Sequence, residues 1–218
     1  GHNLCPYVQR VTILLLEKRI PFDRVDIELH NKPLWLKEIS PQETVPVLVL
    51  TETESIFDST VICDYLDEST SSSIYPKNTY QRALSKSWSQ VGNEILSLIA
   101  KIIYLDKDSN SFSKTISQIK TKFILINEKH SGGKYFMGED FHLIDIIFGT
   151  IFRYLNTIEL ATSKLNLKLY PKLNNWNQSL RKRESITLAV PKNYNELLQS
   201  FIKEKDSYLA HRLELSLK

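Results

Sequence analysis

The sequence predicts a small α/β domain followed by an all-α domain in one chain of 218 residues. Two observations lead to this prediction. Strand-like patterns, in which apolar residues alternate with polar ones or run together, occur only in the first third of the chain. Long segments with apolar residues three and four apart, the spacing of an amphipathic helix, dominate the remainder. We therefore place the first domain at residues 1–70 and the second at 79–218, with a serine-rich linker at 69–78.

The first domain is predicted to alternate between helices and strands. Residues 6–18 place apolar side chains on one stripe of a helix, and Pro21 ends it because proline cannot continue a helix. Residues 25–29 (VDIEL) alternate between apolar and polar side chains, which predicts a half-buried strand. The remaining elements follow in order: a short helix or irregular segment at 32–40, strands at 45–50 and 54–57 joined by a hairpin turn, and a helix at 59–68.

The second domain is predicted to contain helices alone. Helical periodicity extends over the segments 80–105, 112–130, 142–158, 170–183 and 193–205. Pro171 stands in the first turn of the fourth segment, where the missing backbone N–H is not needed.

Composition and charge exclude several classes of function. Hydrophobic residues make up 42% and charged residues 24%, as in ordinary globular proteins. The net charge of +3 is too small to indicate a nucleic-acid partner, and the basic run LRKRE (180–184) reads as a solvated helix face. No apolar run reaches the roughly 20 residues that span a membrane, and we find no signal peptide. We expect no membrane contact.

Cysteine and histidine usage indicates a reducing environment and no metal. The two cysteines, Cys5 and Cys63, do not form a disulfide framework, so a cytoplasmic location is expected. The five histidines show no paired spacing typical of metal ligands. Cys63 lies among apolar residues and is expected to be an inert core residue.

Cys5 stands at the expected first turn of the first helix, next to Pro6. Unpaired N–H groups and the positive end of the helix dipole favour an anion at that point. A thiol there can have its pKa lowered from about 8.5 to roughly 3.5–7.5. A reactive thiol is one interpretation, and a small buried filler is the other.

The pair Val45–Pro46 interrupts the start of a predicted interior strand, where proline is normally excluded. A cis peptide bond would reconcile the two, because it turns the backbone so that Val45 offers its N–H and C=O to a ligand. Cis bonds are a minority of about 5–6% among X–Pro bonds.

Asp58 and Ser59 stand at the start of the helix predicted at 59–68. Their side chains are suited to capping that helix. The same helix start can hold a ligand carboxylate. The motif alone leaves both interpretations open.

Taken in order, the motifs CPYVQR (5–10), NKPLWLKEISPQETVPVL (31–48), DST (58–60) and YLDE (65–68) resemble those of cytosolic glutathione S-transferases. A cysteine with an adjacent proline resembles the omega class and its bacterial relatives. The segment GEDFHLIDIIFGTIFRYL (138–155) is similar to the buried helix of that family, so the resemblance extends over nearly the whole chain. It implies a thioredoxin-like α/β domain followed by an all-α domain.

The resemblance also implies a role for each motif residue. Cys5 would be the catalytic thiol that forms a mixed disulfide with glutathione, and Tyr7 would flank it. Val45, before a cis Pro46, would pair with the cysteinyl backbone of the tripeptide. The two ends of glutathione would be bound by Asp58 and Ser59 at the γ-glutamyl amine and carboxylate, and by Lys32 at the glycyl carboxylate.

The residue types favour a monothiol reaction. Val8 stands where a dithiol enzyme would carry its second cysteine, so a second glutathione is the natural thiol to resolve Cys5. We expect glutathione-dependent thiol transfer or reduction, such as deglutathionylation or dehydroascorbate reduction, of a small hydrophobic or disulfide co-substrate lying against the helical domain. Conjugation would be secondary, because a cysteine that forms a disulfide with glutathione consumes the thiolate that conjugation needs.

Two other hypotheses use the same fold. A non-catalytic binding or regulatory protein, similar to bacterial starvation regulators, would have no chemical need for Cys5, Lys32, Val45–Pro46 and Asp58–Ser59 together. A membrane-inserting relative is disfavoured by the lack of a long apolar segment. By analogy with the family we expect a homodimer.

Three departures from the family pattern stand out. Aspartate replaces the more usual glutamate before Ser59. His142 stands where serine or threonine usually caps the buried helix, which puts the reciprocal hydrogen bond from Asp145 in question. In the family an interior strand precedes the cysteine, whereas only GHNL precedes Cys5 here. Of the aromatic residues that could line a substrate pocket, Trp176 is expected to pack in the core.

Overall fold

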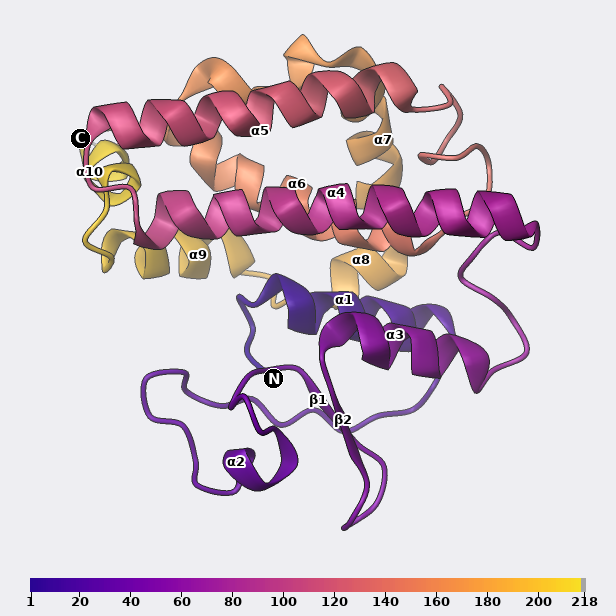
Figure 1. Cartoon of the computed structure of the whole chain (residues 1–218). Coiled ribbons are helices and arrows are strands. Elements are labelled where there is room, and N and C mark those ends of the chain that lie inside the picture. Colours follow the sequence, from indigo (N-terminus) through magenta and orange to yellow (C-terminus); the bar gives the residue numbers. More distant parts are fainter. Residues whose placement is uncertain (217–218) are drawn as a thin grey trace.

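The computed structural model describes residues 1–216, and Figure 1 shows their arrangement. Within this described range, both strands lie in the first 57 residues. The first part of the chain contains, in order, α1 (Pro6–Glu17), α2 (Leu36–Ile39), β1 (Val47–Val49), β2 (Ser55–Phe57) and α3 (Ser59–Glu68). The α/β arrangement predicted for this part is therefore present, with a two-stranded sheet.

The hairpin and α3 form where the sequence predicts them. Strands β1 and β2 pair antiparallel with Val47 opposite Phe57. The helix predicted at 59–68 begins and ends at those residues. Asp58 stops the strand and starts the helix, since its carboxylate accepts hydrogen bonds from the first turn of α3.

The strand predicted at 25–29 is wrong. These residues form no ladder. The N–H of Ile27 donates to the carbonyl of Gly1, and the Gly1 amino group donates to the carbonyl of Val25. Val25 is 64% exposed and Leu29 38% exposed, so the apolar side chains of the alternating pattern do not reach a core. An alternating pattern produces a strand only where a paired neighbour satisfies its backbone.

In the second part of the chain, the regular elements of the described residues, up to 216, are all helices, as predicted. The five expected helices are α4 (Thr79–Tyr104), α5 (Ser109–Lys129), α6 (Leu143–Ala161), α7 (Pro171–Arg181) and α9 (Tyr194–Lys203). The sequence analysis missed α8 (Glu184–Leu188) and α10 (Tyr208–Ser216), as well as 3-10 turns at 163–165 and 167–169. Helices this short offer too few turns for a periodic pattern to stand out.

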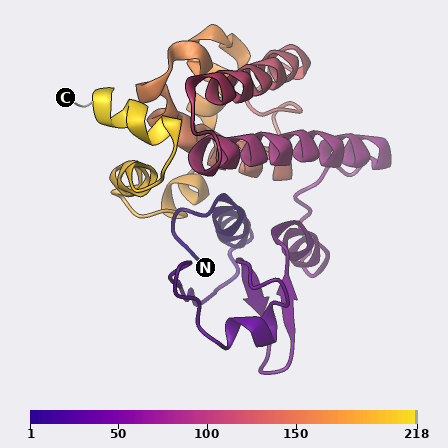
Figure 2. The ribbon, with the colours of Figure 1, turned by 60° about the vertical axis from the view of Figure 1, so that its left-hand side comes forward.

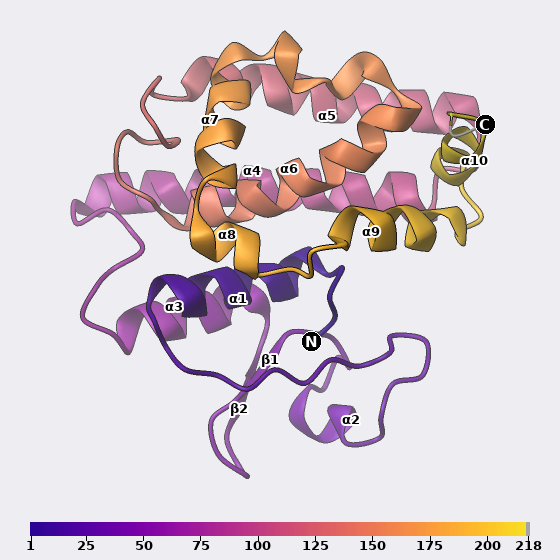
Figure 3. The ribbon, with the colours of Figure 1, turned by 180° about the vertical axis from the view of Figure 1, so that it is seen from behind.

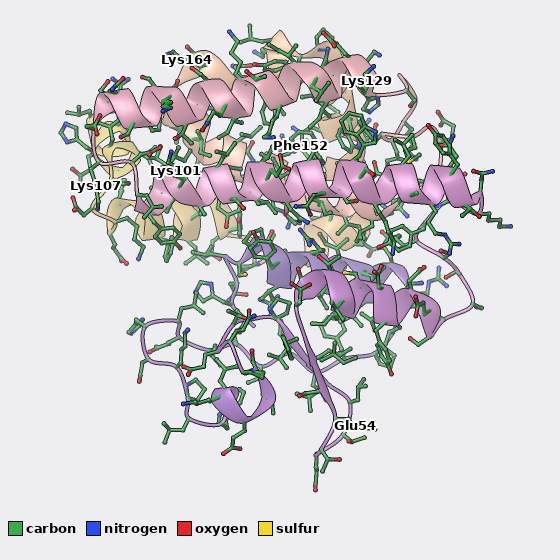
Figure 4. The ribbon with its side chains drawn as sticks, viewed as in Figure 1. Glu54, Lys101, Lys107, Lys129, Phe152 and Lys164 are labelled. Atoms are coloured by element: carbon green, nitrogen blue, oxygen red, sulfur yellow. The ribbon has the colours of Figure 1, made fainter. Side chains whose placement is uncertain are left out.

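Helix α6 is the centre of the core. It is buried on nearly every side, as expected of a helix that is apolar all round. Helix α4 crosses it closely at Gly92, where an added Cβ would come within 2.7 Å of Ile147. Phe152 of α6 lies inside the helical layer, whereas Glu54 lies near the tip of the hairpin (Figure 4). None of the described helices is long and apolar enough to cross a membrane.

Helix α1 joins the two parts of the molecule. It packs on α3 on one side and on α6 and α8 on the other, as the opposite views of Figures 1 and 3 show. Two side-chain contacts tie these layers together. The Arg183 guanidinium donates to both carboxylate oxygens of Glu17, and Arg153 Nη1 lies 2.5 Å from Gln9 Oε1.

The linker predicted at 69–78 is held by specific bonds. Asp67 accepts from the backbone N–H of Ile74 at 2.6 Å and pairs with Lys18 at 2.9 Å. Ile74 and Tyr75 are buried. Figure 2 shows this segment passing from the small domain to the helical layer.

Candidate active site

Cys5 is the residue immediately before α1, with Pro6 in the first helical position. Its Sγ lies 4.0 Å from the carbonyl oxygen of Val45, and its side chain is half-buried. The structure thus brings together two motifs that are 40 residues apart in the sequence. A thiol held at a helix N-terminus beside a backbone carbonyl has a fixed position from which to react.

The pKa of Cys5 is raised, whereas the reactive-thiol interpretation of the sequence expected it to be lowered. Burial raises the pKa of the Cys5 thiol and is the largest effect. The backbone N–H groups of Val8 and Tyr7 and the charge of Arg10 act in the lowering direction, but they are weaker. The prediction considered the helix terminus without the loss of solvation at an apolar surface, which penalises the charged form.

Val45 lies in the loop before β1. The side chain of Lys32 contacts the same loop. The Val45–Pro46 bond is cis. The Ser40 hydroxyl donates to the Thr44 carbonyl and accepts from the Thr44 N–H, which fixes the loop at this point. Lys32 Nζ donates to the carbonyl of Glu43 at 2.8 Å, two residues before Val45.

At the start of α3, one oxygen of Asp58 accepts the N–H groups of Thr60 at 2.8 Å and Val61 at 3.2 Å. Asp58 has φ 69° and ψ 121°, a conformation that residues other than glycine rarely adopt. Strained residues of this kind cluster at ligand sites. The capping interpretation of this motif is therefore confirmed, and the second carboxylate oxygen of Asp58 accepts no hydrogen bond from residues 1–216.

The sequence analysis did not assign Arg10, which the structure places against this helix start. Arg10 is 1% exposed, and its Nη1 donates to the Ser59 hydroxyl at 3.1 Å and to the Thr60 hydroxyl at 3.3 Å. Its Nη2 contacts Asn93, an uncharged partner. Because Ser59 accepts from Arg10, its own proton is free to be donated to an anion. A charged residue within the apolar stripe of α1 was the signal that could have identified it.

Cys5 also lines a cavity of about 160 Å³ between the small domain and the helical domain. Cys5, Pro6 and Tyr7 form the wall from the small domain, and α4 and the side chains of Tyr154 and Phe201 form the wall from the helical domain. The Tyr154 hydroxyl donates to the carbonyl of Leu4 at 2.6 Å, so it holds the residue that precedes the cysteine. Tyr7 lines the same cavity as the Cys5 thiol.

The remaining candidate residues lie in the core. Cys63 is fully buried, and burial raises its pKa to about 12, as expected of an inert thiol. Trp176 is fully buried and donates to Asp145 at 2.8 Å. The reciprocal bond doubted for α6 is present, since Asp145 accepts the N–H of His142 at 2.7 Å, while the His142 ring contacts the Ile74 carbonyl. Within residues 1–216, no group of three or more His, Cys, Asp or Glu is arranged to hold a metal.

Comparison with known proteins agrees with this geometry. Residues 4–69 match the family described as glutathione S-transferase, N-terminal domain. A glutathione S-transferase omega-1 from Sus scrofa is 26% identical over 188 residues, which cover 85% of this chain and 76% of that protein.

Two solved structures show the extent of the likeness. A glutathione S-transferase from Methylobacillus flagellatus, with GSH bound, has a TM-score of 0.77 and 26% identity, covering 88% of this chain and 97% of that one. Rice GST1 in complex with glutathione has a TM-score of 0.82 and 18% identity, covering 93% and 92%, which shows the shared fold. The small sheet domain and the helical domain together have the glutathione S-transferase fold, and residues 4–69 match the N-terminal domain of that family.

Proposed function

We propose that the protein is a glutathione-dependent thiol transferase of the omega-like, cysteine type, and that Cys5 is its catalytic residue. The observation that carries this proposal is the position of the Cys5 thiol, at the start of α1, 4.0 Å from the Val45 carbonyl and at the wall of an apolar cavity. Other supporting facts are the omega-1 relatives and the GSH bound to the Methylobacillus protein.

Glutathione is proposed to lie across the loop before β1 and the start of α3. Val45 would pair with its cysteinyl backbone, beside the cis Pro46. Ser59 would donate to the γ-glutamyl carboxylate, and the free oxygen of Asp58 would accept from the amine. Lys32, which already contacts this loop, would leave the Glu43 carbonyl to pair with the glycyl carboxylate. Tyr7 would flank the thiol.

The γ-glutamyl carboxylate of bound glutathione would also lower the free-energy cost of burying the Arg10 guanidinium. A buried guanidinium without a carboxylate partner is costly, and burial lowers its pKa. A carboxylate on Ser59 would supply the missing negative charge nearby. We therefore add Arg10 as a positioning residue that orients the Ser59 hydroxyl.

The reaction is proposed to proceed in two thiol exchanges. Cys5 thiolate attacks the glutathione sulfur of a mixed disulfide, the other thiol leaves, and Cys5 is left bound to glutathione. A second glutathione attacks that disulfide and releases oxidised glutathione with free Cys5. The raised pKa of Cys5 means that binding must supply a proton acceptor or a stabilising charge before the first exchange.

The protein is proposed to act as a homodimer in a reducing, cytoplasmic compartment. Four apolar side chains of the hairpin and α3 are unusually exposed: Val49 at 54%, Phe57 at 38%, Val61 at 53% and Tyr65 at 38%. A second copy would cover them. Light scattering at micromolar concentration gives the mass directly, and a monomer would contradict this part of the proposal.

Turnover of a glutathionylated peptide tests the proposed function. Cys5→Ala is expected to abolish glutathione-dependent release of the peptide thiol, whereas the matched control Cys63→Ala retains it, because Cys63 is buried away from solvent. Circular dichroism establishes that both variants are folded. Undiminished turnover in Cys5→Ala would overturn the assignment.

A further inference from the structure

The cavity beside Cys5 is small and uncharged, which restricts what it can hold. Its volume is about 160 Å³, and Asp, Glu, Lys and Arg are absent from the described residues that line it. Its polar groups are the Cys5 thiol, tyrosine hydroxyls and the imidazole of His2. Burial lowers the pKa of His2, so that this ring is neutral at pH 7. A charged group placed here would lose its hydration without gaining a counter-ion.

The volume indicates the size of the occupant. Apolar cavities of about 150 Å³ in protein cores bind a single benzene ring. Ile99 and Leu96 supply flat aliphatic surface, and Tyr154 supplies an aromatic wall. A fused two-ring system does not fit within this volume: its second ring would have to extend out of the cavity, or the surrounding helices would have to move, which close-packed interiors resist.

The mouth of the cavity separates it from a larger, charged cleft. The rings of Tyr104 and Phe201 lie edge to face, 6.2 Å apart, and contribute to both spaces. Beyond them the cleft widens to about 610 Å³ and is lined by Asp26, Glu204 and Lys205 among others. Of these two spaces, the outer cleft is the one in which charged parts of a substrate can stay hydrated or pair with charged side chains.

We propose that the inner cavity is selective for one uncharged aromatic ring, carried by the thiol that Cys5 displaces from glutathione in the first exchange. This proposal rests on the proposed function and names its substrate class: mixed disulfides between glutathione and neutral single-ring aryl thiols. In the first exchange the Cys5 thiolate forms a bond to the glutathione sulfur, the disulfide bond breaks, and the arylthiolate leaves with the electron pair. In the second, a glutathione thiolate releases Cys5 and forms oxidised glutathione, so one glutathione and one mixed disulfide give one oxidised glutathione and one aryl thiol.

The kinetic test uses the glutathione disulfides of thiophenol, 4-mercaptobenzoate and 2-naphthalenethiol. Each kcat/KM is divided by the rate constant of the same disulfide with glutathione alone, which removes differences in leaving-group reactivity. We expect the phenyl disulfide to exceed the carboxylate and the naphthyl disulfides by about tenfold or more, the size of discrimination that pockets of this kind achieve. Equal values for the three, or a preference for the carboxylate, would overturn the inference.

A direct binding test does not depend on turnover. Thioanisole and 4-(methylthio)benzoate are titrated into wild-type protein and two variants, with binding followed by protein NMR. Ala100→Phe places a ring in the cavity from an exposed position on α4, and Ala83→Phe makes the same change on the same helix away from it. Thioanisole is expected to bind wild type and Ala83→Phe but not Ala100→Phe, and the charged analogue is expected to bind none of them.

The two tests separate the two proposals. Absence of thioanisole binding to wild type, or equal binding by both variants, would overturn the cavity assignment even in an active enzyme. Selective binding of thioanisole without turnover of any disulfide would support the cavity assignment and contradict the proposed function.

Discussion

Two opposed effects act on the thiol of Cys5. Burial beside an apolar cavity raises its pKa, while the first N–H groups of α1 and the charge of Arg10 favour the thiolate. The raised pKa means that the larger part of the thiol is protonated at pH 7. Reaction with a neutral alkylating agent must therefore speed up as the pH rises past the ordinary range of a thiol.

The pH dependence of this reaction can be measured in a Cys63→Ser background. The rate of alkylation of Cys5 by iodoacetamide is expected to inflect above pH 8.5, the ordinary thiol pKa of about 8.5. Arg10→Gln is expected to move the inflection higher, because it removes a charge that stabilises the thiolate. The exposed Arg212→Gln serves as control and leaves it unchanged. An inflection below pH 8, or none of these differences, contradicts this view of Cys5.

A pair of substitutions separates the capping and binding roles of Asp58. Asp58→Asn keeps an oxygen acceptor for Thr60 and Val61 and tolerates positive φ, so the free energy of unfolding should change little. It removes the charge proposed to bind the γ-glutamyl amine, so the Kd for S-methylglutathione should rise about tenfold, as a lost charge-assisted bond predicts. Asp58→Ala should lose about 1 kcal/mol of stability as well. Unchanged affinity in Asp58→Asn would restrict this residue to capping.

At the scale of elements, long helices and caps were predictable from the sequence, whereas pairing and burial were not. Helix α3 begins after Asp58 as its capping side chain predicts, and α6 was identified from its wide apolar stripe. The strand prediction at 25–29 was wrong because a strand needs a paired neighbouring strand, which a local sequence pattern does not reveal. For the same reason, the contact between Cys5 and Val45 required the resemblance, and Arg10 became visible only with the fold.

Helix α6 depends on one buried carboxylate. Asp145 accepts the N–H groups of Phe136 and His142 and the indole N–H of Trp176. Asp145→Ala leaves two buried donors and one partly buried donor without partners, at about 1–3 kcal/mol for each buried donor, so we expect the free energy of unfolding in urea to fall by at least about 2 kcal/mol. The exposed Asp140→Ala should cost less than about 0.5 kcal/mol. Similar losses in the two variants would show that Asp145 is not a structural centre of this helix.

At the scale of the whole molecule, the site exists because the two domains are held in register. Cys5 and Tyr7 of the small domain form one wall of the cavity. Tyr154 and Phe201 of the helical domain form the other. Loosening the domain contact should therefore affect activity as well as stability. The Arg183–Glu17 pair is the place to test this, since Nε and Nη2 of the guanidinium contact the two carboxylate oxygens and neither residue lines the cavity.

A double-mutant cycle measures that contact. Arg183→Ala and Glu17→Ala are each expected to lower the free energy of unfolding by about 1–3 kcal/mol, and the double variant by less than their sum because the two side chains interact. Arg181→Ala, an exposed arginine two residues away, is the matched control. Strictly additive losses would mean that the pair does not couple the domains.

The central claim is that Cys5 is a thiol placed to form a disulfide with glutathione. The most direct measurement is the intact mass of the protein after incubation with oxidised glutathione, for wild type, Cys5→Ser and Cys63→Ser. We expect one glutathionyl adduct on wild type and Cys63→Ser and none on Cys5→Ser. An adduct that persists in Cys5→Ser, or no adduct on any of the three, would contradict it.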